Sequence, residues 1–105
     1  MGMFWWWPFG KVPEVSAQQL EGMRKDASVG PQLIDVRTGI EWNAGHIAGA
    51  IHVPLSEFRV RLPGLQLDGT RPIVAICRSA HRSIPAVREL QRAGFRDACQ
   101  LQGGM

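Results

Sequence analysis

The sequence predicts an α/β fold in which a five-stranded, mainly parallel sheet carries helices on both faces. Short apolar runs of strand length alternate along the chain with segments of helical spacing, and Gly and Pro residues separate them. The most apolar run, Pro72–Ile76, is β-branched at three of five positions, which is typical of a buried central strand. A chain of 105 residues with 45% hydrophobic content suits one domain and excludes two independent ones.

The elements expected in the first half are bounded by residues that start or stop helices and strands. In order, they are a short strand ending at Val15, a helix over 16–27 capped by Ser16, a buried strand over 32–37, a short helix over 39–44 closed by Gly45, a strand over 50–53 stopped by Pro54, and a turn or short helix through Arg61 capped by Ser56.

The second half holds the central strand and the best-marked helix. After the strand over 72–76, we expect a polar loop over 77–82 and a helix that starts at Ser83 and stops at Gly94. A last strand is expected over 98–101. Strands that alternate with helices at such short spacing form βαβ units with right-handed crossovers, and this predicts a mainly parallel sheet.

Residues 1–13 differ from the rest of the chain and are expected to be an appendage to a domain over 14–105. They hold Trp5, Trp6 and Trp7, three of the four tryptophans. The apolar stretch is too short to span a bilayer, and Pro8 breaks any helix through it. Three roles stay open: a cover for an apolar groove on the same domain, self-association or packing on a partner, and contact of the indoles with a membrane surface.

Charge and cysteine content narrow the class of protein. Residues 1–57 carry four Lys/Arg and six Asp/Glu, whereas residues 58–105 carry eight Arg and three acids. No basic stripe interleaved with aromatic residues is present, so we expect a small anionic substrate and no nucleic acid. The two cysteines are too few for a disulfide scaffold, and no secretory signal precedes them, which predicts a cytoplasmic protein.

Cys77 lies where the predicted central strand ends and a helix follows. Ligands of open α/β sheets bind at the carboxyl ends of strands, and a helix N-terminus offers free N–H groups and partial positive charge. Together with Arg78, His81 and Arg82, this setting favours the ionised sulfur and makes Cys77 a candidate nucleophile. The alternative is that Cys77 is a small apolar residue ending a strand.

Three stretches resemble the single-domain rhodaneses, a family of sulfurtransferases, and the resemblance covers residues 13–105. They are Ile34-Asp35-Val36-Arg37 with Glu41 four residues on, Gly45-His46-Ile47-Ala48-Gly49-Ala50-Ile51-His52-Val53-Pro54, and the Cys77 loop with Gly94-Phe95 and Leu101-Gln102-Gly103-Gly104. The resemblance implies a rhodanese-like fold without metal or cofactor. It also implies that Cys77 accepts a sulfane sulfur from a donor such as thiosulfate, becomes a persulfide and passes the sulfur to cyanide or a thiol.

The same resemblance assigns the residues of the loop. Backbone amides from Arg78 through Ser79, Ala80, His81 and Arg82 to Ser83 would cradle the sulfur. Arg82 would orient the loop or bind the anion, and Arg78 is similar to the cationic residue of members that use thiosulfate. Two departures stand out. Ala80 replaces a usual glycine, which implies strain if the position needs a positive φ, and the sequence stops where the family usually adds a final helix.

Other matched residues have simple structural interpretations. Asp35 lies at the end of a strand, Arg37 and Glu41 are expected to form an ion pair at a helix entry, and His46 is expected to be a hydrogen-bonding turn residue. Cys99 is expected to be buried in the last strand. It would resolve a persulfide only if it reached the loop.

Two alternatives to a sulfurtransferase stay open: a non-catalytic rhodanese-like binding or regulatory module, and a phosphatase or arsenate reductase on the same scaffold. Four residues separate Cys77 from Arg82. The corresponding loop of cysteine phosphatases is one residue longer, because a phosphoryl group needs a wider ring of amide donors than one sulfur atom. The loop length therefore favours sulfur chemistry. It leaves the donor, the acceptor and the oligomeric state open.

Overall fold

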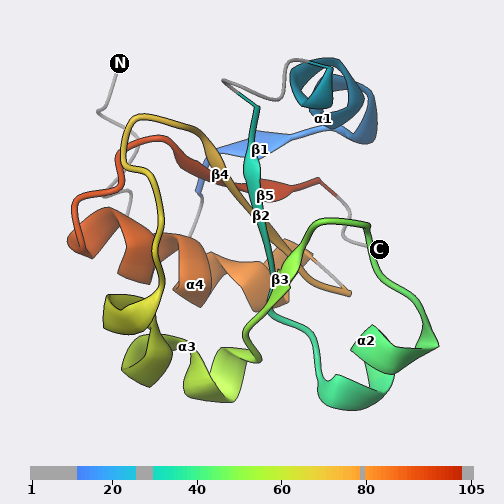
Figure 1. Ribbon diagram of the computed structural model, residues 1–105, viewed down its shortest axis with the longest axis vertical. Helices are drawn as coiled ribbons and strands as arrows, with labels where there is room; N and C mark the ends of the chain where they lie inside the picture. Colours follow the sequence, from blue (N-terminus) through green and yellow to red (C-terminus); the bar gives the residue numbers. More distant parts are fainter. Residues whose placement is uncertain (1–11, 26–29, 79, 103–105) are drawn as a thin grey trace.

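The computed structural model describes residues 12–25, 30–78 and 80–102, and a five-stranded sheet crosses its middle (Figure 1). The strands are β1 (Glu14–Val15), β2 (Gln32–Asp35), β3 (Ile51–His52), β4 (Ile73–Ile76) and β5 (Ala98–Leu101). Their order is β1-β5-β4-β2-β3, and every neighbouring pair is parallel. The prediction of a parallel five-stranded sheet with β4 at its centre is confirmed.

Helices cover both faces of the sheet, as the sequence predicts. They are α1 (Ala17–Arg24), α2 (Gly39–Ala44), α3 (Leu55–Arg61), the 3-10 turn η2 (Leu62–Gly64) and α4 (Ala80–Arg92). In Figure 1, α3 and α4 lie on one side of the sheet and α1 on the other, while α2 extends beyond the end of β2. The carboxyl ends of β2 and β4 therefore open toward α2 and the start of α4.

The sheet separates two apolar clusters of unequal size. The larger one contains Phe58 of α3, Val87 and Leu90 of α4, and one set of alternating strand residues. The smaller one contains Leu20 of α1 and the opposite set of strand residues, Val74 and Ile76 among them. All four residues of β4 are buried, because alternating side chains enter opposite clusters. This double burial explains why β4 reads as a continuous apolar run.

Capping interactions agree with the sequence at one helix and differ at another. The Ser16 side chain accepts from Gln19 N–H, and the Gln19 side chain accepts from Ser16 N–H, so the predicted cap of α1 is confirmed as a capping box. The predicted cap at Ser56 is wrong, since α3 already begins at Leu55. Pro54 precedes it with a φ of −53°, so the proline ring presets the backbone angle and no side-chain cap forms.

The element after Cys77 also starts earlier than predicted. Helix α4 begins at Ala80 rather than Ser83, so the polar loop is shorter than expected and residues 80–82 belong to the first helical turn. No described residue other than glycine has a positive φ, and Ala80 is helical, so the strain considered for this alanine does not arise. The free N–H groups at the start of α4 therefore lie near the end of β4.

Some expectations fall on residues outside the described part of the chain. The tryptophan-rich appendage falls there except for Val12 and Pro13, and so do the last three residues of the expected domain. Among the described residues, no helix is long and apolar enough to cross a membrane.

Candidate functional site

Cys77 follows β4 directly and is fully buried at the carboxyl end of the sheet. Its thiol lies 3.2 Å from Ser83 Oγ, on the first turns of α4, and donates a hydrogen bond to it. The apolar cluster beneath α3 and α4 packs against the same side chain. Strand β4 and helix α4 thus fix both sides of the sulfur, and the N-terminus of a 13-residue helix lies beside it.

A buried polar path leads away from Cys77 toward the edge of the sheet. The Ser83 hydroxyl donates to Gln100 Oε1 at 2.6 Å, and Gln100 Nε2 donates to Glu14 Oε1 on β1 at 3.2 Å. Ser83 and Gln100 are buried, whereas Glu14 is exposed. The sequence predicts Ser83 only as a backbone donor and does not indicate a role for Gln100. The available signal was an amide side chain inside the otherwise apolar strand over 98–101.

Arg78 is held over the site by the helix that follows β2. Its guanidinium lies 3.5 Å from Glu41 Oε2 of α2, and 71% of the Arg78 side chain is exposed. Glu41 also accepts hydrogen bonds from Thr38 N–H and Oγ1, which fixes the carboxylate at the start of α2. Arg78 is therefore a cation at the surface, oriented by one partner and accessible to an anion.

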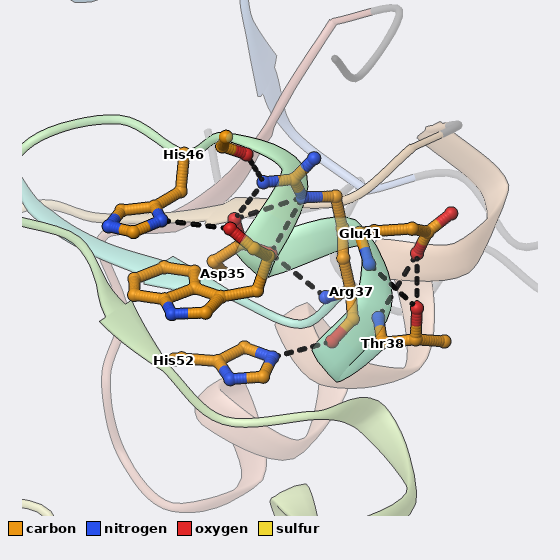
Figure 2. A network of polar contacts seen from close by, with 8 residues as sticks. Asp35, Arg37, Thr38, Glu41, His46 and His52 are labelled. Carbon is orange, nitrogen blue, oxygen red and sulfur yellow. Dashed lines mark hydrogen bonds and ion pairs between the residues drawn. The ribbon is translucent and has the colours of Figure 1, made fainter.

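The end of β2 carries a buried ion pair, level with the end of β4. Asp35 stands opposite Ile76 in the register, and its carboxylate binds Arg37 Nε at 3.0 Å and Nη2 at 2.8 Å (Figure 2). Arg37 Nη2 also donates to the carbonyl of Gly45 at 2.6 Å. The predicted ion pair between Arg37 and Glu41 is wrong, because the arginine turns back to its own strand.

Gly45 ends α2 with a φ of +148°, a conformation that side-chain-bearing residues rarely adopt. Because Arg37 holds the carbonyl of this residue, the buried pair fixes the turn that carries α2 past the strand ends. It thereby positions Glu41, and through Glu41 the guanidinium of Arg78.

An aromatic stack braces this turn. Trp42 packs against His46 with ring centroids 3.4 Å apart and against His52 with centroids 4.7 Å apart. His46 Nδ1 bonds the carbonyl of Trp42, and His52 Nε2 bonds the carbonyl of Arg37, as Figure 2 shows beside the ion pair. The prediction that His46 is a hydrogen-bonding turn residue is confirmed.

Cys99 lies on the other face of the sheet from Cys77. It stands opposite Val74 and belongs to the cluster under α1, whereas Cys77 belongs to the cluster under α4. Burial, followed by the nearby Asp97 carboxylate, raises the pKa of the Cys99 thiol to about 11. The expectation that Cys99 is buried is confirmed, and its position across the sheet does not allow it to resolve a persulfide on Cys77.

We expect Cys99 to resist iodoacetamide at neutral pH in the folded protein and to react once the protein is unfolded. The folded thiol must lose a proton against burial, which leaves roughly a hundredfold less thiolate than in the unfolded chain. Peptide mass spectrometry of alkylated protein, with and without denaturant, measures this. Equal labelling of Cys99 in both states would contradict the buried position.

The predicted roles of the loop residues between Arg78 and Ser83 stay predictions. Ser79 and the side chains of Ala80, His81 and Arg82 lie outside the described part of the structure, although the backbone of 80–82 forms the first turn of α4. Within the described ranges, no group of three or more His, Cys, Asp or Glu side chains could hold a metal ion.

Comparisons with known proteins agree on one family. The model of the rhodanese-like domain matches residues 16–105. Thiosulfate sulfurtransferase GlpE of Shewanella oneidensis is 37% identical over 86% of this chain and 85% of its own length. A rhodanese-like domain protein from Staphylococcus aureus superposes with a TM-score of 0.78 and 26% identity, covering 90% of this chain and 88% of that one. An HTH-type transcriptional regulator of Mycobacterium tuberculosis is 40% identical over 89% of this chain, which spans only 41% of the regulator's length.

Proposed function

Because this chain belongs to the rhodanese-like sulfurtransferase family, we propose that it moves a sulfane sulfur from an anionic donor such as thiosulfate to cyanide or a thiol through a persulfide on Cys77. The observation that carries the proposal is the position of Cys77 Sγ, between the carboxyl end of β4 and the first turn of α4. This is the place where an open α/β sheet presents free amide donors to an anion.

The reaction follows from two displacements at sulfur. The Cys77 thiolate attacks the outer sulfur of thiosulfate, an S–S bond to Sγ forms, the S–S bond of the donor breaks, and sulfite leaves with the electron pair. The acceptor then attacks the outer sulfur of the persulfide, and the Cys77 thiolate leaves. Each step moves one sulfur atom and one electron pair, so no external oxidant or reductant takes part.

The described residues support charge stabilisation at each step. The N-terminus of α4 stabilises the thiolate and the terminal sulfur of the persulfide, because its free N–H groups lie nearest the end of β4. Arg78 offers an accessible positive charge for the sulfonate group of the donor. The Asp35–Arg37 pair and Glu41 position these parts without contacting the substrate.

The experiment that tests the proposal is intact-mass spectrometry after incubation with thiosulfate. A gain of one sulfur atom that acceptor thiols or cyanide reverse, and that maps to Cys77, is the expected result. A wild-type protein that gains no sulfur from thiosulfate or another sulfane donor would contradict the proposal and favour the non-catalytic alternative.

A phosphatase is the competing activity, and the loop length distinguishes it. Thiosulfate:cyanide transfer and aryl phosphate hydrolysis should be assayed side by side, before and after insertion of one glycine between Ser79 and Arg82. We expect sulfur transfer alone in the unmodified chain. Phosphatase turnover comparable to sulfur transfer in the unmodified chain would overturn the assignment. Phosphatase activity that appears only after the insertion would support the argument from loop length.

We predict that Arg78→Ala lowers kcat/KM for thiosulfate by about tenfold, which corresponds to the loss of one charge-assisted contact of roughly 1.5 kcal/mol. The value stands at the lower end of the range because the guanidinium is largely exposed and solvent screens it. Glu41→Gln keeps the Arg78 charge but loses the carboxylate that orients it, and it should lower kcat/KM by less than Arg78→Ala does. Steady-state kinetics measures both, and an unchanged value in Arg78→Ala would assign donor binding to backbone amides.

A further inference from the structure

A cavity of about 210 Å³ lies at the amino end of the sheet, on the side that α1 covers (Figure 1). Its wall is formed at the end of α1 and at the starts of β2, β3 and β4, by Arg24, Gly30, Pro31, Leu33, Ala48 and Arg71 among others. Leu33 belongs to the apolar cluster under α1, whereas Cys77 belongs to the cluster under α4 and follows the carboxyl end of β4. The cavity is therefore separate from the candidate active site.

Two arginines line this cavity, and neither forms an ion pair with an acidic side chain of the described residues. Arg24 Nη2 donates to the carbonyl of Ala48 at 3.2 Å, and Arg71 Nε donates to the carbonyl of Gly30 at 3.0 Å. Both acceptor residues also line the cavity, so each guanidinium lies in its wall. A guanidinium has five N–H donors, and a neutral carbonyl does not compensate its charge. The wall therefore presents two positive charges with further donors.

The loop before β4 is tied to the start of β2, which holds the backbone of Arg71 in place. Gln32 Nε2 donates to the carbonyls of Asp68 at 2.8 Å and of Arg71 at 3.3 Å, and Gln32 Oε1 accepts from Asp68 N–H at 2.7 Å. Gln32 N–H also donates to the carbonyl of Pro72 at 2.8 Å. A binding group that is already fixed loses less conformational entropy when a ligand arrives.

The turn before β3 supplies the acceptor for Arg24. Ala50 N–H donates to the carbonyl of Ile47 at 3.1 Å and closes the turn, in which Gly49 has a φ of +86°. A positive φ at the third position of such a turn favours glycine. Because the turn's own hydrogen bond uses the Ile47 carbonyl, the Ala48 carbonyl is left to accept from Arg24.

Negative charge near the cavity is smaller than the charge of the two arginines. Asp68 accepts from Thr70 Oγ1 at 2.6 Å and from Thr70 N–H at 2.9 Å. These hydrogen bonds and, to a smaller extent, the charge of Arg71 lower the pKa of Asp68, so this carboxylate is ionised at neutral pH. The carbonyls at the end of α1 add a partial negative charge beside Arg24, which lies in the last turn of that helix. Two full positive charges outweigh one carboxylate and one helix end.

The size and the lining of the cavity indicate the class of ligand. A volume of about 210 Å³ is below the roughly 300–1,000 Å³ of pockets that hold drug-sized molecules. It still exceeds the volume of several water molecules, each of about 30 Å³, so it has room for more than a bare ion. Pro31 and Leu33 offer apolar surface in the same wall as the two arginines. An anionic head on a short apolar group matches both features.

We propose that this cavity is a binding site for a small organic oxyanion, a carboxylate or a phosphate on a short apolar group, and that Arg24 and Arg71 bind its oxygens. Both heads offer the paired oxygens that a guanidinium binds through two parallel hydrogen bonds. The site does not depend on the proposed function, because it lies at the other end of the sheet and uses none of the residues assigned to sulfur transfer.

The test is an NMR titration of the nitrogen-15-labelled protein at constant ionic strength. Butyrate and propyl phosphate carry the apolar group, and acetate and inorganic phosphate carry the head alone. We expect saturable binding of butyrate or propyl phosphate with a Kd of roughly 1 mM or below. The backbone amides of Gly30, Leu33, Gly49 and Arg71 should shift, and the matching head alone should bind more weakly. The probe that binds more tightly identifies the head as carboxylate or phosphate.

Variants of the two arginines measure their part in binding. Arg24→Met and Arg71→Met should each weaken binding by about five- to tenfold, the loss of one charge-assisted contact that solvent partly screens. Arg71→Lys keeps the charge but loses the fork of donors, so its affinity should lie between those of Arg71→Met and the wild type. Asp68→Asn keeps an oxygen for Thr70 and removes the opposing charge, so it should tighten binding. Arg92→Met, which removes the same charge from an exposed position on α4, is the matched control and should bind as the wild type does.

Titrations that do not saturate with any probe would overturn the inference, and so would unchanged binding in a folded Arg24→Met/Arg71→Met protein. Shifts confined to Arg78 and the residues after it would also overturn it, because they would place the anion beside Cys77. If the arginine variants do not fold, Asp68→Asn decides, and an affinity no tighter than that of the wild type would contradict the inference.

Sulfur loading from thiosulfate separates this inference from the proposed function. Arg24→Met and Arg71→Met should load sulfur as the wild type does, since both residues lie at the amino end of the sheet. A wild-type protein that binds the organic anion but gains no sulfur would contradict the proposed function alone. A wild-type protein that gains sulfur but binds none of the probes at the cavity would contradict the inference alone.

Discussion

Replacement of Cys77 by serine should abolish sulfur loading and lower sulfur-transfer turnover by at least about a thousandfold. A hydroxyl cannot form the S–S bond that carries the sulfur atom, although it occupies nearly the same volume. The fold should survive, because serine can still donate to Ser83 Oγ as the thiol does. Intact-mass spectrometry and thiosulfate:cyanide assays measure the activity, and thermal melting measures the fold.

Cys99→Ala is the matched control, because it removes the other buried thiol of the chain on the opposite face of the sheet. It should keep sulfur loading and lose only the packing of one sulfur atom. Turnover of Cys77→Ser equal to that of the wild type would remove Cys77 from the mechanism. Loss of loading in a folded Cys99→Ala protein would show that sulfur loading needs the Cys99 thiol as well as the Cys77 thiol.

The sequence predicted the order of helices and strands because that order depends on local patterns. Apolar runs and helix caps repeat at short range, so β4, α2 and the cap at Ser16 could be read directly. The start of α4 could not, because residues 77–82 are polar and a polar first helical turn looks like a loop. The cap expected at Ser56 failed because Pro54, two residues earlier, already sets the helical entry.

Partners of charged side chains were predicted less well, because they depend on how the chain turns after each element. The spacing of Arg37 and Glu41 suggests a helical pair, but Arg37 precedes α2 and turns back to Asp35. Glu41 accepts a hydrogen bond from Thr38 N–H at the start of α2 and pairs with Arg78, which follows a different strand. The contacts of Gln100 with Ser83 and Glu14 depend on the register of three strands, which no single stretch of sequence contains.

The largest expected effect on stability concerns the buried ion pair at the end of β2. Arg37→Met should lower the free energy of unfolding by about 3–5 kcal/mol, because it leaves the fully buried Asp35 carboxylate without its partner. It also removes the bond to the Gly45 carbonyl that fixes the turn after α2. Urea denaturation followed by circular dichroism measures the change.

Arg61→Met is the matched control, since Arg61 pairs with Glu57 across one exposed helical turn of α3. Solvent screens that pair, and its loss should cost less than about 1 kcal/mol. Equal costs for Arg37→Met and Arg61→Met would mean that water reaches Asp35 and that the pair at the end of β2 is not a buried one.

A double variant separates the charge from the packing. Asp35→Asn/Arg37→Met removes both charges but keeps an oxygen that accepts from the backbone N–H of residue 37, as Asp35 Oδ1 does. We expect the double variant to be more stable than Arg37→Met alone, because the cost of the single variant comes mainly from an unpaired buried charge. If instead both variants lose the same free energy, the guanidinium acts through its contact with Gly45, and the turn that carries Glu41 depends on that bond rather than on the ion pair.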